Sequence, residues 1–91
     1  MFCKVVTVKN KTGLHARPAS EFVSKAKSFG CTVTIRKAGG EQEPVNAKSM
    51  LRLLSLGLVQ GTEVEIAADG ADEAAAVNAL VELVESGFGE V

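Results

Sequence analysis

The sequence has few aromatic residues, with four Phe and neither Trp nor Tyr. It also lacks an excess of positive charge, because 10 Lys and Arg are opposed by 11 Asp and Glu, for a formal net charge of -1. Proteins that bind nucleic acids use basic surfaces to contact phosphates, and those that bind single strands add aromatic side chains on which bases stack. We therefore set a nucleic-acid-binding function aside.

Long apolar runs are absent as well. The longest, residues 53–59, is interrupted by Ser55 and Gly57 and falls far short of the roughly 20 residues that span a bilayer. The first residues lead directly into a Val-rich segment without the features of a secretory signal. We expect a soluble, cytoplasmic protein that does not insert into a membrane.

Cysteine is scarce, and neither Cys3 nor Cys31 belongs to a CxxC pair. A reducing compartment keeps such residues as thiols, so the favoured interpretation is two buried small hydrophobic residues, with a structural disulfide as the alternative. One histidine and two scattered cysteines also lack the spacing of metal ligands. We expect neither a metal nor a cofactor.

The apolar residues that are present follow the periods of strands and helices. At 91 residues and 46% hydrophobic content the chain can build one core, which predicts a single domain over residues 1–91. Period-two patterns predict strands at 2–8, 31–36, within 42–46 and at 62–67, and helical spacing predicts helices at 16–29, from the Ser49 cap to about 56, and from 72 onward. The order βαββαβα predicts a two-layer α/β sandwich with helices on one sheet face.

The single histidine lies in Gly13-Leu14-His15-Ala16-Arg17-Pro18, between the first predicted strand and helix. The free N–H groups of a helix's first turn bind anions readily. Pro18 leaves the register open, because either Arg17 or His15 can cap the helix. A phosphoryl group on the imidazole would be solvated by the Arg17 guanidinium and by the backbone of Ala16 and Arg17. The alternative is a capping or surface histidine beside an ordinary arginine. A hydrolase using His15 as a base lacks any nucleophile elbow or triad.

A second informative stretch begins at Ser49. Its hydroxyl is first a helix cap, and it is also a candidate phosphorylation site, where a phosphate would lie next to Lys48 and Arg52. The helix that follows carries more apolar residues than one buried face of so short a helix needs: Met50, Leu51, Leu53, Leu54 and Leu56. They indicate either a thicker core or an exposed docking patch.

Together these motifs resemble those of HPr, the histidine-containing phosphocarrier family of the bacterial phosphoenolpyruvate:sugar phosphotransferase system. Residues 13–19 are similar to the active-site signature of that family. Lys48-Ser49 with the following apolar helix and Leu56-Gly57 is similar to its serine-site signature. The likeness extends to residues 60–62 and 70–73 and so covers nearly the whole chain.

The resemblance implies an open-faced βαββαβα sandwich with three helices on one face of an antiparallel sheet ordered 1-4-2-3. It implies a cytoplasmic phosphocarrier without turnover of its own, in which His15 accepts a phosphoryl group on Nδ1 from phosphorylated enzyme I. His15 then donates it to the IIA domains of sugar permeases, with Arg17 assisting. We also expect the chain to be a monomer.

For partner binding the resemblance implies an apolar patch ringed by basic residues: Met50, Leu51 and Leu54, with Lys27, Lys48 and Arg52. In lineages that possess an HPr kinase/phosphorylase, the serine matched by Ser49 is phosphorylated, and the product joins a transcription repressor as corepressor. An alternative function is therefore a regulatory HPr-like module acting through phospho-Ser49 or in a nitrogen-related phosphorelay.

Overall fold

The computed structural model describes residues 1–89. Its elements, in chain order, are β1 (Phe2–Thr7), α1 (Ala16–Lys27), β2 (Thr32–Lys37), β3 (Val45–Asn46), α2 (Met50–Ser55), β4 (Glu63–Asp69), α3 (Glu73–Glu85) and the short 3-10 turn η1 (Gly87–Gly89). The predicted order of strands and helices is confirmed. The 3-10 turn is an addition that the sequence pattern did not indicate.

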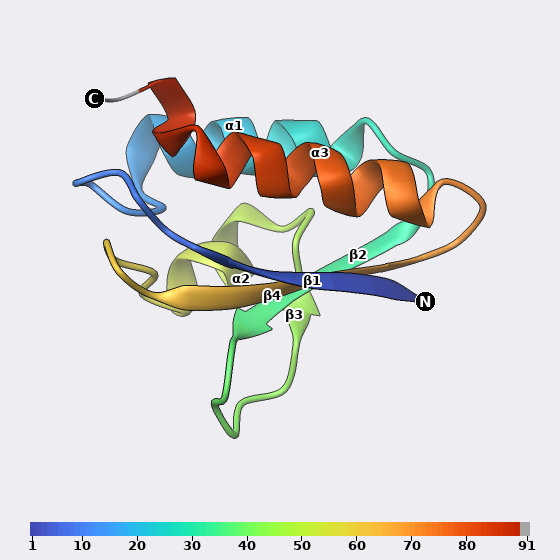
Figure 1. The fold of residues 1–91 in the computed structure, drawn as a ribbon, viewed down its shortest axis with the longest axis horizontal. Helices are drawn as coiled ribbons and strands as arrows, with labels where there is room; N and C mark the ends of the chain where they lie inside the picture. The colour runs from blue at the N-terminus through green and yellow to red at the C-terminus, as the bar shows by residue number, and fades with distance from the viewer. Residues whose placement is uncertain (90–91) are drawn as a thin grey trace.

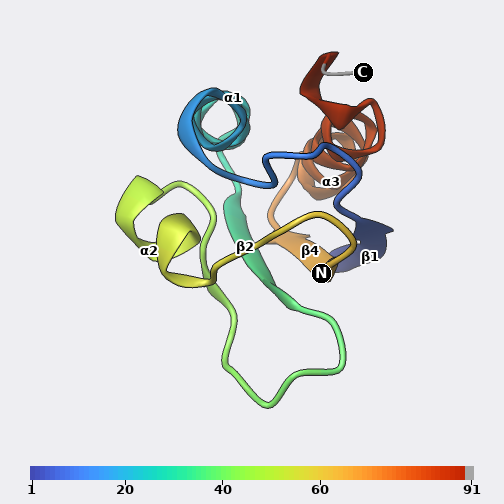
Figure 2. The same ribbon diagram turned by 90° about the vertical axis from the view of Figure 1, so that its left-hand side faces the viewer.

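The four strands form one antiparallel sheet in the order β1-β4-β2-β3. Strand β4 pairs with both β1 and β2, and its Ile66 lies opposite Lys4 on β1 and opposite Ile35 on β2. Helices α1 and α3 lie over one face of the sheet, and the shorter α2 contacts α1 and β3 (Figures 1 and 2). The fold is therefore the expected open-faced α/β sandwich.

The core fills the space between the helices and the covered face of the sheet. Its largest fully buried side chains come from both layers and from the connecting loops: Leu14, Phe22, Ile35, Leu53, Leu58, Ile66 and Leu80. The opposite face meets solvent, and adjacent residues of β1 mark the change, since Val6 is 6% exposed and Val5 is 54% exposed. This alternation follows from the two-residue period of a strand.

The expectation that both cysteines are buried is wrong for Cys3. Both cysteines are free thiols, but only Cys31 is buried. Cys3 alternates with Phe2 along β1 and shares the side of Val5, so it projects from the face without helices. Predicted element ends differ from the observed ones by one or two residues at several places. Among residues 1–89, no helix has the length and apolar character needed to cross a membrane.

Candidate functional site

His15 occupies the N-cap of α1, with extended backbone angles of φ -128° and ψ 159°. Its side chain is exposed and makes no capping hydrogen bond to the helix. This geometry settles the register that Pro18 left open: His15 is the cap, and Pro18 is the third helical residue. It also removes the capping alternative, because the imidazole is not engaged in holding the helix start.

The first turn of α1 is open to an anion. Ala16 and Arg17 are exposed, whereas Pro18 and Ala19 are buried and anchor the turn. The first turn contains no acidic residue, and within residues 1–89 no ion pair or hydrogen bond engages the Arg17 guanidinium. An anion arriving beside His15 therefore meets free helix amides and a guanidinium with no carboxylate competing for either.

The backbone next to His15 is strained. Ala16 has a φ of 50°, in the left-handed region that residues with a Cβ rarely adopt. Such strain persists only where the surroundings fix the conformation, and it clusters at functional sites. Here the surroundings are the buried residues on either side, Leu14 and Pro18.

The loop that precedes His15 is fixed to the loop that precedes β4. The Leu14 amide donates to the Leu58 carbonyl oxygen at 2.9 Å, and the Gln60 side chain donates to the Lys9 carbonyl oxygen at 3.0 Å. Both Leu14 and Leu58 are 1% exposed. The histidine is thus carried by a loop with a buried anchor immediately behind it.

Gly13 is required by this contact between loops. Its φ is 68°, and a Cβ placed on it would overlap the Leu58 carbonyl oxygen and lie 2.9 Å from the Val59 Cα. Any other residue would push the two loops apart or leave the left-handed region. The sequence indicated a permissive turn at Gly13 but not the close approach of residues 58 and 59.

Helix α2 divides its apolar residues between core and surface. Leu53 and Leu56 are 0% and 6% exposed, whereas Leu51 is 78% exposed, Leu54 40% and Met50 36%. The helix thus supplies both core and exposed apolar residues, and docking by the exposed ones stays a prediction. Ser49 caps the helix as expected, since its Oγ accepts a hydrogen bond from the Arg52 amide at 3.3 Å.

The exposed part of α2 is connected to His15 through the chain that follows the helix. Gly57 donates to the Leu54 carbonyl oxygen at 3.2 Å, and Leu58 then accepts the Leu14 amide. Figure 2 views the molecule from the end where the two loops meet, and α1 and α2 lie side by side there. We call Met50, Leu51, Leu54 and Val59 the apolar patch.

The sequence pattern did not identify Val59 as part of this surface. It is 55% exposed and adjoins Gly13, which adds it to the patch on the side of the His15 loop. Its place at the end of the apolar run of residues 53–59 was a signal, but that run alone did not distinguish surface from core.

The three predicted basic residues are not equivalent. Lys27 and Arg52 are exposed, whereas the Lys48 ammonium donates to the Phe29 carbonyl oxygen at 2.7 Å. Lys48 therefore ties the segment before α2 to the segment just after α1. Its role in contacting a partner stays a prediction, as do those of Lys27 and Arg52.

Known proteins share this fold and are similar to the chain in sequence. Residues 2–86 match the family described as "PTS HPr component phosphorylation site". The chain belongs to the HPr family. It is 43% identical to the phosphocarrier protein HPr of Haemophilus influenzae over 84 residues, which cover 92% of this chain and 95% of that protein.

Two further relatives extend the comparison. A crystal structure of HPr from Thermoanaerobacter tengcongensis is 45% identical, covers 100% of this chain and 99% of its own, and superimposes with a TM-score of 0.93. The multiphosphoryl transfer protein of Haemophilus influenzae is 36% identical over 92% of this chain, but the chain spans only 17% of the length of that larger protein. Several relatives are named phosphocarrier proteins, and the chain is likewise a phosphocarrier of the HPr type in the phosphotransferase system.

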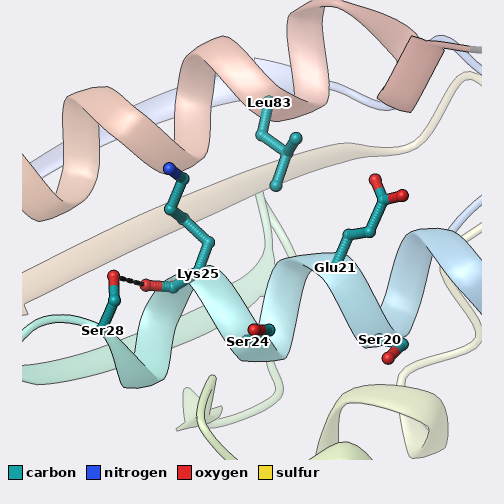
Figure 3. A pocket seen from close by; sticks show the side chains of 6 residues that line it. All are labelled: Ser20, Glu21, Ser24, Lys25, Ser28 and Leu83. Carbon is teal, nitrogen blue, oxygen red and sulfur yellow. Dashed lines mark hydrogen bonds between the residues drawn. The ribbon is translucent and has the colours of Figure 1, made fainter.

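A hollow on this HPr-family chain lies away from the histidine. It is a shallow groove between α1 and α3 (Figure 3), lined by Ser20, Glu21, Ser24, Lys25, Ser28 and Leu83. Its one hydrogen bond between lining residues runs from the Ser28 hydroxyl to the Lys25 carbonyl oxygen at 2.6 Å, and it assembles no nucleophile with a base. Across the described part of the chain, no cluster of three His, Cys, Asp or Glu residues could hold a metal ion. The exposed start of α1 is thus the candidate site.

Proposed function

We propose that this chain carries a phosphoryl group on His15, accepting it from phosphorylated enzyme I and passing it to the IIA domains of sugar permeases. The observation that supports the proposal most directly is the uncapped, exposed imidazole at the N-cap of α1. A histidine that stabilises the fold would be buried or hydrogen-bonded. A phosphoryl carrier instead needs an accessible imidazole, because it has to contact two partner proteins in turn.

The chemistry is two successive displacements at phosphorus. In the first, the bond between phosphorus and the donor breaks as a bond to the His15 imidazole nitrogen forms, and in the second the imidazole leaves as the IIA group attacks. The free N–H groups of the helix start and the Arg17 guanidinium stabilise the phosphoryl oxygens. The helix end contributes about 0.3 to 2 kcal/mol, a modest stabilisation that does not prevent onward transfer.

The test of this proposal is labelling by enzyme I and phosphoenolpyruvate. We expect one phosphoryl group per chain, labile in acid, and its complete loss in His15→Ala with folding unchanged by circular dichroism. Arg17→Ala should still be labelled but more slowly, since it removes a charge and not the nucleophile. Failure of the unaltered protein to take up phosphate overturns the proposal.

The apolar patch serves as the docking surface for these partners. Leu51 is its most exposed member, so Leu51→Ser should raise KM for the phosphorylated donor without lowering kcat. Val5→Ser is the matched control, because Val5 is 54% exposed but lies on the open sheet face. Equal effects of the two substitutions contradict a docking role for the patch.

A regulatory role for Ser49 is favoured by its position beside the patch. A phosphate there would add up to about two negative charges next to Met50 and Leu51 while the helix cap persists. The comparison of Ser49→Asp with Ser49→Asn isolates charge, because both residues cap helices well. We expect the aspartate alone to raise KM for enzyme I, and a KM shared by both variants argues against charge-based control.

A further inference from the structure

Asn10 is an unusual residue for its location. It is 3% exposed, and among positions 1–89 it is the only polar or charged residue that is buried. It nevertheless belongs to the loop that leads to the exposed His15. Burying an amide side chain is unfavourable unless hydrogen bonds compensate it. Its contacts therefore indicate what the residue does.

Those contacts close a turn around the residues just before the histidine. The Asn10 side-chain nitrogen donates to the Gly13 carbonyl oxygen at 2.8 Å and to the Thr12 hydroxyl at 3.1 Å. The backbone carbonyl oxygen of Asn10 in turn accepts the Gly13 amide at 3.1 Å. Gly13 is thus held at both its N–H and its carbonyl oxygen by one residue.

This clamp acts on the backbone that carries the imidazole. The Gly13 carbonyl belongs to the peptide unit that joins Gly13 to Leu14, and the Leu14 amide on the other side of that unit donates to Leu58. Both polar groups of the Gly13–Leu14 peptide, one peptide unit before the one that joins Leu14 to His15, are therefore fixed by buried partners. The direction in which the chain enters the N-cap follows from this peptide's orientation.

We propose that Asn10 is a positioning residue for phosphoryl transfer, which holds the Gly13–Leu14 peptide so that the His15 imidazole meets phosphorus in line. The inference rests on the proposed carrier function. In-line displacement depends on near-attack geometry, and a misplacement of about 1 Å can slow a reaction by roughly 100-fold. Asn10 touches no reacting atom, so its action passes through the backbone.

Two substitutions separate the donated hydrogen bonds from the space that the side chain fills. Asn10→Asp keeps the shape, but an ionised carboxylate cannot donate to the Gly13 carbonyl oxygen. Asn10→Ala removes the side chain altogether. We expect kcat for transfer from phosphorylated enzyme I to fall about tenfold in both, with KM within about twofold of the original because the apolar patch is untouched.

A conservative variant and a core variant serve as controls. Asn10→Ser retains a hydroxyl donor, so its kcat should lie between those of Asn10→Ala and the unaltered protein. It also serves as the test variant if Asn10→Asp and Asn10→Ala fail to fold. Val77→Ala alters the core beneath α3, where Val77 is 0% exposed, and should lower thermal stability while transferring at the original rate. A fall in kcat that simply follows stability across all four variants overturns the inference.

A second measurement does not depend on transfer at all. The imidazole nitrogen resonances of His15, recorded by NMR in the unphosphorylated protein, should broaden and shift in Asn10→Asp but stay in place in Val77→Ala. Unchanged resonances together with unchanged kcat overturn the positioning role while the carrier function stands. Failure of the unaltered protein to become labelled overturns the carrier function instead, so the two failures are distinguishable.

Discussion

The two ends of α1 are built in opposite ways. At its N-terminal end the His15 side chain makes no capping hydrogen bond, the first turn has no acidic residue, and Ala16 has a left-handed φ. At its C-terminal end, which a helix of 12 residues places about 18 Å away, the carbonyl oxygens are occupied: Ser28 donates to Lys25 at 2.6 Å and Lys48 to Phe29 at 2.7 Å. Carbonyl oxygens are thus hydrogen-bonded at the C-terminal end of the helix and just beyond it, whereas the amides of the first turn are open to a ligand.

The segment that follows the C-terminal end of α1 is also bound to the start of α3. The Gly30 amide donates to the Asp72 carboxylate at 3.2 Å. The pKa of Asp72 is lowered chiefly by the hydrogen bond from the Cys31 thiol, and burial, reinforced by Asp72, raises the pKa of that thiol. These polar contacts all lie at the end of α1 remote from His15. The comparison shows that hydrogen bonds engage the C-terminal end of α1, whereas buried neighbours hold the N-terminal end and leave its first-turn amides open to an anion. Substitutions at each end test this difference.

The largest effect is expected for Gly13→Ala at the open end. A Cβ there meets the Leu58 backbone while the residue keeps a φ of 68°, so overlap and left-handed strain add to a loss of about 3 kcal/mol in the free energy of unfolding. Urea denaturation measures the loss. We also expect phosphoryl transfer to slow, because the anchor behind His15 moves.

Gly39→Ala is the control for that substitution. Gly39 has a comparable φ of 74°, but a Cβ added to it would meet nothing within 4 Å, so only the conformational penalty of about 1 kcal/mol applies. The difference between the two losses isolates the contact with Leu58. Equal losses would show that the loops can separate freely.

A smaller effect is expected for Lys48→Met at the C-terminal end of α1. The substitution removes the hydrogen bond to the Phe29 carbonyl oxygen, worth about 1 kcal/mol in a partly exposed position. Lys27→Met removes an exposed charge from the same end of α1 and should leave stability within about 0.5 kcal/mol. Thermal denaturation of the pair provides the measurement, and an unaltered midpoint in Lys48→Met would refute the bridging role.

The effect of pH should be smaller again and confined to acid. The folded-state pKa of Asp72 lies below its ordinary value, so its contribution is present above the unfolded pKa of about 3.9 and is lost as pH falls through the folded pKa. Glu73 behaves likewise, because the Gly70 amide and then the N-terminus lower its pKa. Melting temperatures from about pH 6 to pH 3 should fall less steeply in Asp72→Asn than in the unaltered protein. Parallel curves would exclude the Asp72 contribution.

Much of the fold could be predicted because the local patterns agree with the global arrangement. The alternation of Cys31, Val33 and Ile35 placed one face of β2 and the residue before it in the core, and all three are buried. Ser49 identified the start of α2 from the chemistry of a cap alone. His15 was identifiable as a candidate site because it is the chain's one histidine and lies between a strand and a helix.

Contacts between segments that are distant in the chain could not be predicted from the sequence. The clash that makes Gly13 necessary comes from Leu58, in the loop before β4, and the hydrogen bond of Lys48 goes to the Phe29 carbonyl, just beyond the end of α1. Val59 and Leu58 are adjacent apolar residues, yet one is 55% and the other 1% exposed. The period of apolar residues does not say which side chains of a loop are exposed, so the exposure of Val59 could not be predicted. The same holds for Cys3, which lies on a strand whose apolar residues alternate imperfectly.

The smallest change in stability is expected for Ala16→Gly, which tests the strain at the open end directly. Glycine adopts a φ of 50° without the penalty of about 1 kcal/mol or more that alanine bears, but it gains about 0.4–1 kcal/mol of conformational freedom in the unfolded chain. The two terms oppose each other, so the free energy of unfolding should change by less than about 0.5 kcal/mol. Ala75→Gly, at an exposed position inside α3, lacks the compensating relief and should lose about 1 kcal/mol. If the two alanines lose equal stability in urea denaturation, the left-handed φ of Ala16 carries no energetic cost. If Ala16→Gly alone is tolerated, the buried residues on either side, Leu14 and Pro18, hold Ala16 in a conformation that alanine disfavours, next to the histidine.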